Sequence, residues 1–398
     1  MMRAYTVRDT RTYYTHRISL INLQSVTFNE LQSHPARGAI AVASYLGLLG
    51  QAGSIRDGLA EANRATTLTT QTVEEWTAKE RQLREMGWSE RDIAEVKRAI
   101  GPREAGLTAL AAVDRRIIDL GNSRPIVERA ALFDTSELHR ITLGAAHESM
   151  RARGEVGAVA AIEEALHRTA DLGIEEIAVT WSFPIAMAAF GYTRGVSGLG
   201  EGVFQGFARA GAYDGKFPIF AVATDTEALL VTLSALSVVR WLCDESHGSA
   251  PVPENIGDAR KMILEIFANR EVSPEPAAAL ETLVHTISHV MLRALDDGQV
   301  GFAEASLAEW VVPETLTFAL YANNLKSYTL GALWTLLNNR TLQWLNKSAT
   351  GMLRCENDPL CHQRSPRACE RCLYLTFGCP SFNDHLDRRL LASFWRNA

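Results

Sequence analysis

The sequence of 398 residues is informative first through what it lacks. No stretch provides the roughly 18 to 20 uninterrupted apolar residues of a membrane helix, because Pro184, Asp225 and Glu227 break the longest apolar runs. The N-terminal residues contain no apolar core of a secretory signal. The net charge of −6 excludes a basic surface over the whole molecule, so nucleic-acid binding would require a local patch. We therefore expect a cytoplasmic protein without membrane segments.

The motifs of nucleotide-driven enzymes are also missing. The chain contains no Walker A lysine motif and no DEAD-like box. The glycine-rich segment at 198–202, GLGEG, has neither the spacing of a dinucleotide fold nor the lysine of a phosphate-binding loop, and we interpret it as a surface loop. The sequence therefore predicts a protein that does not itself hydrolyse ATP.

The hydrophobic patterns predict a mixed α+β fold in which helix outweighs strand. Strand character is found at 11–25, 174–195, 217–234 and 317–324, with short helices expected between the second and third of these segments. Helical patterns occupy 38–53, 72–100 with a break at Met86, 155–173, 276–298 and 329–346.

A segment with glycines and two prolines, at 248–259, is the best candidate for a linker. It separates two regions that both have clear hydrophobic patterns. We therefore predict an N-terminal region at 1–247, followed by a smaller C-terminal α/β lobe at 260–398.

Cysteine is scarce except near the C-terminus, where five of the six cysteines lie between residues 355 and 379. The pair Cys369 and Cys372 has the spacing of a zinc knuckle, in which two sulfur atoms from one tight turn reach a tetrahedral ion at about 2.3 Å. In a reducing compartment such a cluster is more typical of metal binding than of disulfides. We therefore predict one structural Zn²⁺ held by four cysteines, with no coordination position open for hydrolysis.

Three further cysteines and His362 compete for the two remaining ligand positions. We favour Cys361 and Cys379, because they flank the knuckle closely, and we assign Cys355 to packing or to a supporting role. The sequence leaves this choice open, so all five cysteines are candidate metal ligands.

A second candidate is the segment HTISH, in which His285 and His289 are four residues apart and can share one face of a helix. A zincin-type hydrolase would need a glutamate directly after the first histidine, and this chain has Thr286 there. The neighbouring residues are apolar, which indicates a buried helix. We therefore interpret the pair as structural core histidines with satisfied hydrogen bonds rather than as a metal site.

Arginines interleaved with aromatic residues surround the cysteines. This composition suits a surface that docks nucleic acid or protein, although a solvated helix face explains part of it equally well. The candidate docking residues are Arg364, Arg367, Arg371, Arg388 and Arg389.

Several short motifs follow one another over roughly 120 residues. They are VHTISH (284–289), TFALYANN (317–324), YTLGAL (328–333), CENDPLC (355–361), CERCL (369–373), Cys379, Asn383 and LDR (386–388). In this order they resemble the MrfA-type zinc-binding domain, and more closely its version in the DrmB family of the DISARM phage-defence system, with Ala332 in place of a second glycine. Upstream, TYYTHRISLINLQ (12–24), AAFGYTRG (188–195) and TEALLVTLSALSVVRWL (226–242) resemble further DrmB segments. The chain lacks the N-terminal piece of those proteins, so we expect a divergent or split homologue.

The resemblance implies a non-catalytic partner of a superfamily-2 helicase. In DISARM this partner is DrmA, and the pair binds and handles invading DNA. We accordingly expect a zinc-stabilised accessory or scaffold subunit that acts with a helicase or another ATPase. The competing hypotheses are a metal-dependent hydrolase or nuclease, which the missing catalytic motifs disfavour, and a self-standing nucleic-acid-binding protein, which the negative charge disfavours.

Overall fold

In a computed structural model, the chain has an α+β fold that is rich in helix. The structure describes residues 13–49, 54–93, 96, 110, 113–134, 138–195, 202–207, 216–244, 251–295, 302, 306–323, 331–351, 355, 360–361, 368–369, 372–375 and 378–397. Within these ranges no helix is both long enough and apolar enough to cross a membrane.

The chain forms two compact units, and both are discontinuous in sequence. The sheet unit comprises residues 1–23, 139–241 and 279–398, and the helical unit comprises 24–138 and 242–278. The predicted division into consecutive domains at 248–259 therefore does not match the structure. The physical reason is that a strand before that segment pairs with a strand after it, so backbone hydrogen bonds of one sheet join the two proposed domains.

The sheet unit is built on a sheet of seven antiparallel strands. Five of them lie side by side in the order β1-β3-β5-β7-β6, and the two short strands β2 and β4 each pair with β3. The strands are β1 (Tyr13–Ile21), β2 (Arg140–Thr142), β3 (Ile174–Gly195), β4 (Gly202–Gly206), β5 (Phe220–Leu233), β6 (Leu307–Val312) and β7 (Thr317–Ala322). The strands predicted at 11–25, 174–195, 217–234 and 317–324 are thus confirmed. The short helices expected between the second and third do not occur among the described residues there, where β4 pairs with β3 instead.

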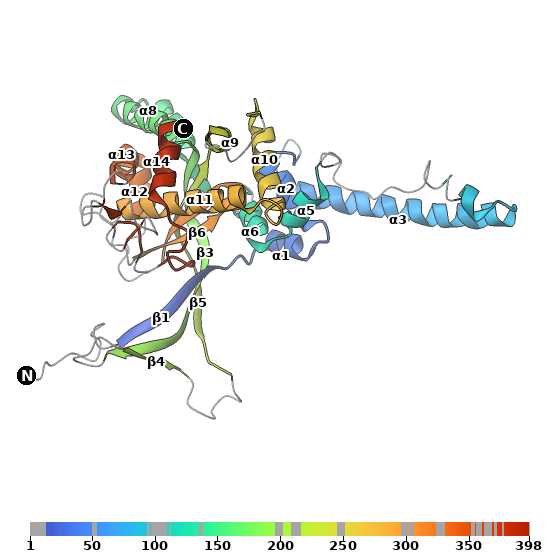
Figure 1. The fold of residues 1–398 in the computed structure, drawn as a ribbon, viewed down its shortest axis with the longest axis horizontal. Helices are drawn as coiled ribbons and strands as arrows, with labels where there is room; N and C mark the ends of the chain where they lie inside the picture. The colour runs from blue at the N-terminus through green and yellow to red at the C-terminus, as the bar shows by residue number, and fades with distance from the viewer. Residues whose placement is uncertain are drawn as a thin grey trace, which may run out of the picture. The chain divides into compact units, whose positions relative to one another are not determined.

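The long strands β3 and β5 each have a buried and a more exposed part. In β5, residues 226–233 are buried, whereas residues 220–225 are mostly exposed. We call the outer segments of the sheet the arm; it consists of residues 13–21, 185–195, 202–206 and 220–225, which pair with one another. Figure 1 shows the arm running out from the part of the sheet that the helices cover.

The helices of the sheet unit pack on the buried part of the sheet and on one another. They are α7 (Leu143–Ala152), α8 (Val156–Asp171), most of α9 (Ala235–Asp244) and of α11 (Pro274–Leu295), α12 (Ala332–Asn339), α13 (Thr341–Gly351) and α14 (Arg388–Asn397). Gly173, in the left-handed region with φ of 63°, follows α8 and ends the helix predicted at 155–173. The single helix predicted at 329–346 is divided into α12 and α13, because the backbone of Arg340 (φ −137°) ends α12.

A buried carboxylate on β5 fixes the start of α12. Glu227 is 1 % exposed, and its Oε2 accepts hydrogen bonds from the backbone N–H groups of Gly331 (3.1 Å) and Leu333 (3.2 Å). Its Oε1 accepts a third bond from the backbone N–H of Trp334 at 2.8 Å. Negative charge at the N-terminus of a helix is favourable, because the free N–H groups and the helix dipole both stabilise it.

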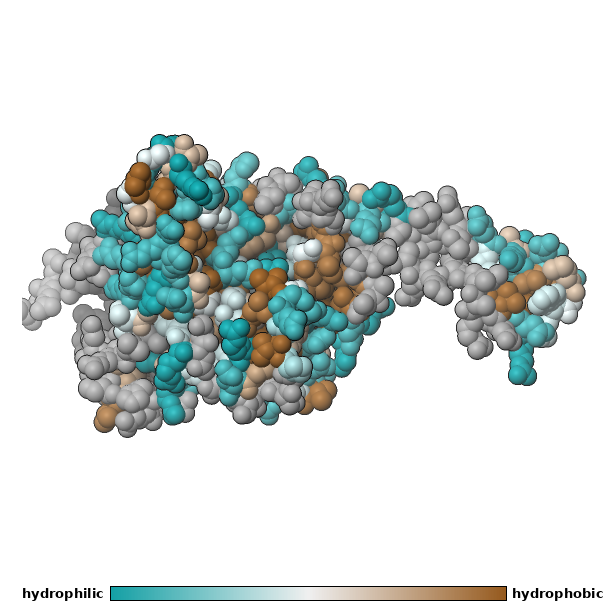
Figure 2. Space-filling model, turned by 90° about the horizontal axis from the view of Figure 1, so that it is seen from above, coloured by the Kyte–Doolittle hydropathy of each residue, from teal (hydrophilic) through white to brown (hydrophobic). Residues whose placement is uncertain are grey.

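The helical unit contains α1 (Val26–Ser33), α2 (Arg37–Leu46), α3 (Ile55–Glu85), α5 (Arg115–Gly121), α6 (Arg124–Phe133) and α10 (Ile256–Ala268). Helices α2 and α5 approach closely at two glycines: a Cβ on Gly38 would lie 2.5 Å from the carbonyl oxygen of Ile118, and a Cβ on Gly121 would lie 2.5 Å from that of Gly38. The predicted break at Met86 is confirmed, and Ser89 accepts from the backbone N–H of Asp92, as a helix start requires. Apolar side chains are exposed beyond the end of α3, including Met86 and Trp88. Figure 2 shows that apolar colour is present among the hydrophilic side chains of the surface.

Candidate metal centres

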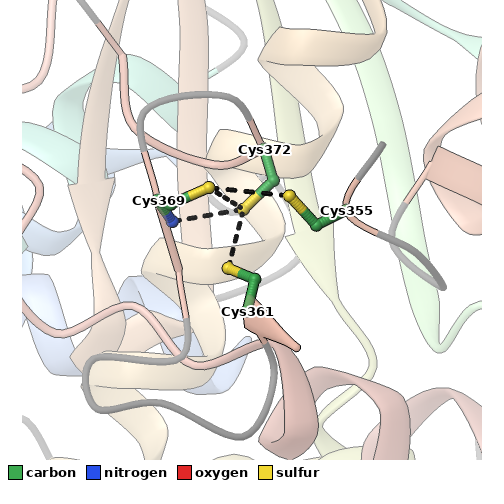
Figure 3. Close-up of side chains that lie close together, drawn as sticks. All are labelled: Cys355, Cys361, Cys369 and Cys372. Carbon is green, nitrogen blue, oxygen red and sulfur yellow. Dashed lines mark hydrogen bonds between the residues drawn. The ribbon is translucent and has the colours of Figure 1, made fainter. Parts of the chain in front are cut away.

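Four of the clustered cysteines point their sulfur atoms toward one another, as Figure 3 shows. They are Cys355, Cys361, Cys369 and Cys372, and we call them the four-cysteine cluster. The Sγ–Sγ distances are 3.6 Å from Cys355 to Cys369, 3.8 Å from Cys361 to Cys372, and 3.5 Å from Cys369 to Cys372.

These distances fit a shared metal ion. A tetrahedron with zinc–sulfur bonds of about 2.3 Å has edges of about 3.8 Å, whereas a disulfide needs sulfur atoms about 2.05 Å apart. The cluster can therefore hold a tetrahedral ion such as Zn²⁺. Four sulfur ligands would fill every position of that ion, so the cluster leaves no place for an attacking water or a substrate.

The knuckle pair is positioned by a tight turn of the backbone. The carbonyl oxygen of Cys369 accepts from the N–H groups of Cys372 (3.0 Å) and Leu373 (3.1 Å). The N–H of Cys369 donates to Sγ of Cys372 at 3.2 Å, a bond that favours the thiolate. The sequence spacing correctly predicted that these two sulfur atoms lie together.

The electrostatics of the cluster suit a cation. Burial is the largest cause that raises the pKa of the Cys361 thiol, to about 11, and burial also raises the pKa of Cys372. Arg388 acts in the opposite direction on Cys372. Arg388 is itself 3 % exposed, and its Nε and Nη2 have no hydrogen-bond partner among the described residues. A zinc ion with four thiolates has an excess of negative charge, which would compensate this buried guanidinium.

The structure corrects the predicted ligand choice. Cys355 is buried and belongs to the four-cysteine cluster, whereas Cys379 does not. Cys379 instead lies beside His285, with its Sγ 3.4 Å from Nε2 of that histidine. Distance along the chain was a poor guide to this choice, because Cys355 contacts Cys369 from 14 residues away, whereas Cys379, although close to the knuckle in sequence, contacts His285.

Cys379 belongs to a second group that we call the histidine cluster: His285, His289, Glu309 and Cys379. Nε2 of each histidine lies 3.0 Å from Oε1 of Glu309. One ligand-type atom from each of the four residues lies within 4.8 Å of those of the others. The predicted burial and hydrogen bonding of the two histidines are confirmed, but their partners form a set that can also hold a metal ion.

In the histidine cluster, the positive histidines and the negative Glu309 and Cys379 each stabilise the charged form of the other. Burial alone would lower the pKa of both histidines, but contacts with Cys379 and Glu309 raise it to about 9 for His285 and about 10 for His289. Burial alone would raise the pKa of Glu309, but the two histidines hold it well below its usual range. Burial opposes ionisation of Cys379 as well, and hydrogen bonds from the histidines lower the pKa of its thiol.

Sequence analysis missed Glu309. The available signal was an acidic residue in the middle of the apolar strand LAEWVV, where an unpaired carboxylate would be costly. Glu309 is 2 % exposed, so a buried partner had to exist, although its identity depends on the fold.

A cavity of about 320 Å³ adjoins the histidine cluster. Glu309, Cys379 and Asn323 belong to its wall. Asn323 is 8 % exposed, and its Oδ1 has no hydrogen-bond partner among the described residues. The rest of the wall comes from the arm, including His16, Arg17 and Phe190, and from Leu375 and the segment that begins at Gly378.

The candidate docking arginines have different outcomes. Arg364, Arg367 and Arg371 lie outside the residues that the structure describes, as does most of the GLGEG segment. Arg388 is buried, so it cannot offer a docking surface, and this corrects its predicted role. Arg389 is exposed and remains a candidate.

The chain was compared with known proteins. No protein-family model matches it, and no curated protein matches it significantly. The motif resemblance described above therefore remains an expectation.

Proposed function

We propose that this chain is a non-catalytic, zinc-stabilised accessory or scaffold subunit that partners a superfamily-2 helicase in a cytoplasmic, DNA-processing anti-phage complex. The observation that carries the proposal is the four-cysteine cluster, whose sulfur atoms are spaced as the corners of a closed zinc site. A zinc ion held in this way stabilises the fold and takes no part in hydrolysis.

The dependence on a partner is supported by the composition of the chain. The sequence has no phosphate-binding loop, so ATP hydrolysis would come from another polypeptide. A net charge of −6 limits how many DNA phosphates the chain can neutralise. DNA would therefore be bound mainly through the complex. The order of the DrmB-like motifs is the reason for naming a helicase and a defence role.

The arm supplies a surface on which a partner can dock. Phe204 is 53 % exposed on β4, and Phe220 and Val222 are 64 % and 61 % exposed on the arm segment of β5. His16 stacks edge-on against Phe204 with ring centroids 5.3 Å apart. Exposed aromatic residues that gather on one element are typical of protein interfaces.

The test is co-expression of the tagged chain with the products of the genes that neighbour its own, among which the proposal expects a helicase or another ATPase. We expect a complex that survives size-exclusion chromatography, and DNA binding at physiological salt that is tighter for the complex than for the chain alone. Tight DNA binding by the isolated chain, or no association with any neighbouring gene product, would overturn the proposal.

A variant pair tests the docking surface. The double substitution Phe204→Ser and Phe220→Ser should weaken the complex by about tenfold or more while leaving the zinc content unchanged. The matched control is Val156→Ser, which also removes an exposed apolar side chain (81 % exposed) but from α8. If the double variant and the control formed the complex with equal affinity, the arm would be excluded as the docking surface.

A further inference from the structure

We propose that the histidine cluster is a second metal site, which binds a divalent transition-metal ion of the zinc class through Nε2 of His285, Nε2 of His289, a carboxylate oxygen of Glu309 and Sγ of Cys379. The site is distinct from the four-cysteine cluster and does not depend on the proposed function. Its four donor atoms lie within 4.8 Å of one another, and three of the residues are buried.

The direction of the donor atoms distinguishes a metal site from a catalytic triad. In a Cys–His–acid triad, one ring nitrogen of the histidine faces the thiol and the other faces the carboxylate. Here the same atom, Nε2 of His285, lies 3.0 Å from Glu309 Oε1 and 3.4 Å from Cys379 Sγ. Nε2 of His289 also approaches Glu309 Oε1, at 3.0 Å. Nitrogen, oxygen and sulfur atoms that converge on one point are arranged as ligands around an ion.

The surrounding hydrogen bonds hold these donors in position. Nδ1 of His289 donates to the carbonyl oxygen of Leu373 at 2.7 Å, which leaves the Nε2 lone pair available to a metal. Ser288 donates to the second oxygen of Glu309, Oε2, so that Oε1 is left toward the histidines. The backbone N–H of Asn383 donates to Sγ of Cys379 at 3.3 Å and favours its thiolate. Metal ligands are typically supported by partners of this kind.

The donor types indicate the class of ion. Imidazole, carboxylate and thiolate together suit zinc and its neighbours among the transition metals, whereas magnesium and calcium prefer oxygen ligands alone. Two anionic ligands would balance the charge of a divalent cation. The donors come from α11, from β6 and from the segment before α14, so a bound ion would fasten three distant parts of the sheet unit together.

One hydrogen bond and one peptide unit connect the two clusters. Leu373, whose carbonyl accepts the bond from His289, directly follows the knuckle residue Cys372. Occupation of one site therefore holds the backbone on which the other depends. The histidine cluster also differs from the four-cysteine cluster in its surroundings, because Glu309 and Cys379 reach the wall of the cavity described above.

The wild-type protein provides the first test. Elemental analysis of protein purified with added zinc should give two zinc ions per chain. The X-ray absorption spectrum, which averages over both ions, should show sulfur ligands and nitrogen or oxygen ligands in a ratio of five to three, as the two ligand sets together require. One zinc with a shell of four sulfurs would overturn the proposal. One zinc with a shell dominated by nitrogen and oxygen would support it and would count against the four-cysteine site instead.

Substitutions assign each metal to its cluster. Glu309→Gln and Cys379→Ser should each reduce the content from two zinc ions to one and leave a four-sulfur shell. The matched control is Asn323→Ala, which lines the same cavity but supplies no ligand and should retain both ions. The double variant Cys369→Ser and Cys372→Ser should lose the other ion. Retention of two zinc ions in Glu309→Gln would show that the second ion lies elsewhere and would overturn the assignment.

Discussion

A single sulfur atom decides whether the four-cysteine cluster can close around an ion. Cys355 contributes one of the four corners and is 6 % exposed, so water cannot easily replace its sulfur. We expect Cys355→Ser to lose the zinc of this cluster and to lower the melting temperature by several degrees. The control is Cys243→Ser, which removes a cysteine that belongs to neither cluster. Zinc content and thermal unfolding would be measured side by side, and full zinc retention in Cys355→Ser would contradict the structural assignment.

Protons should compete with zinc for the same sulfur atoms. The pKa of Cys361 is raised to about 11 by burial, and that of Cys372 is also raised, so without metal both thiols are protonated at neutral pH. Zinc binds thiolates, so binding releases these protons and strengthens as the pH rises. Competition with a chelator should show zinc affinity increasing at least about tenfold per pH unit between about pH 6 and pH 8. An affinity that does not change over this range would mean that the thiols are already ionised.

At the scale of secondary-structure elements, the attachment of α12 to the sheet depends on the carboxylate of Glu227. Its removal would leave three backbone N–H groups at the helix N-terminus without their acceptor. We expect Glu227→Ala to reduce the free energy of unfolding by about 2 to 4 kcal/mol, because the donors and the space of the side chain are buried. Urea unfolding would measure the loss, with the exposed Glu163→Ala on α8 as the control. Equal stability of the two variants would show that water or another group replaces the carboxylate.

The contact between α2 and α5 makes a second prediction at this scale. A methyl group on Gly121 would lie 2.5 Å from the carbonyl oxygen of Gly38, so Gly121→Ala must push the two helices apart. The expected cost is about 1 to 3 kcal/mol of unfolding free energy. Gly157→Ala is the matched control, because the new methyl group meets no atom within 4 Å other than those of its own helix and chain neighbours, and alanine favours the helix. Chemical denaturation should therefore shift in opposite directions for the two variants.

The residues that the sequence could assign were those whose role depends on local spacing. The alternation in 11–25 and the buried run at 317–324 gave strands, and the Cys-x2-Cys pair gave the knuckle. Cys379 and Glu309 could not be assigned, because their partners lie on α11. His285 is 94 residues from Cys379 and 24 residues from Glu309 along the chain. Spacing along the chain carries no information about contacts that only the folded sheet creates.

At the scale of the whole molecule, the division into units predicts how fragments behave. The segment 260–398, which the sequence suggested as a separate lobe, contains β6 and β7 but not β5, the other neighbour of β7. A fragment with these residues alone would expose the buried face of a two-stranded sheet, and two strands are marginally stable in water. We expect it to be insoluble or unfolded by circular dichroism even with zinc present. A soluble fragment with cooperative unfolding would restore the predicted domain boundary.

The pairing of β1 with β3 also determines how early in translation the sheet can begin to form. Ile21 pairs with Ile185, and β5 in turn needs β7, near residue 320. At roughly 5 to 20 residues per second, the ribosome takes on the order of ten seconds or more to deliver β3 after β1 has been made, and a similar time again to deliver β7. During this interval the helical segment 24–138 emerges and can begin to fold, while β1 waits without a partner strand. The cysteines that close the metal site are translated later still, so the sheet unit can mature only when most of the polypeptide has left the ribosome.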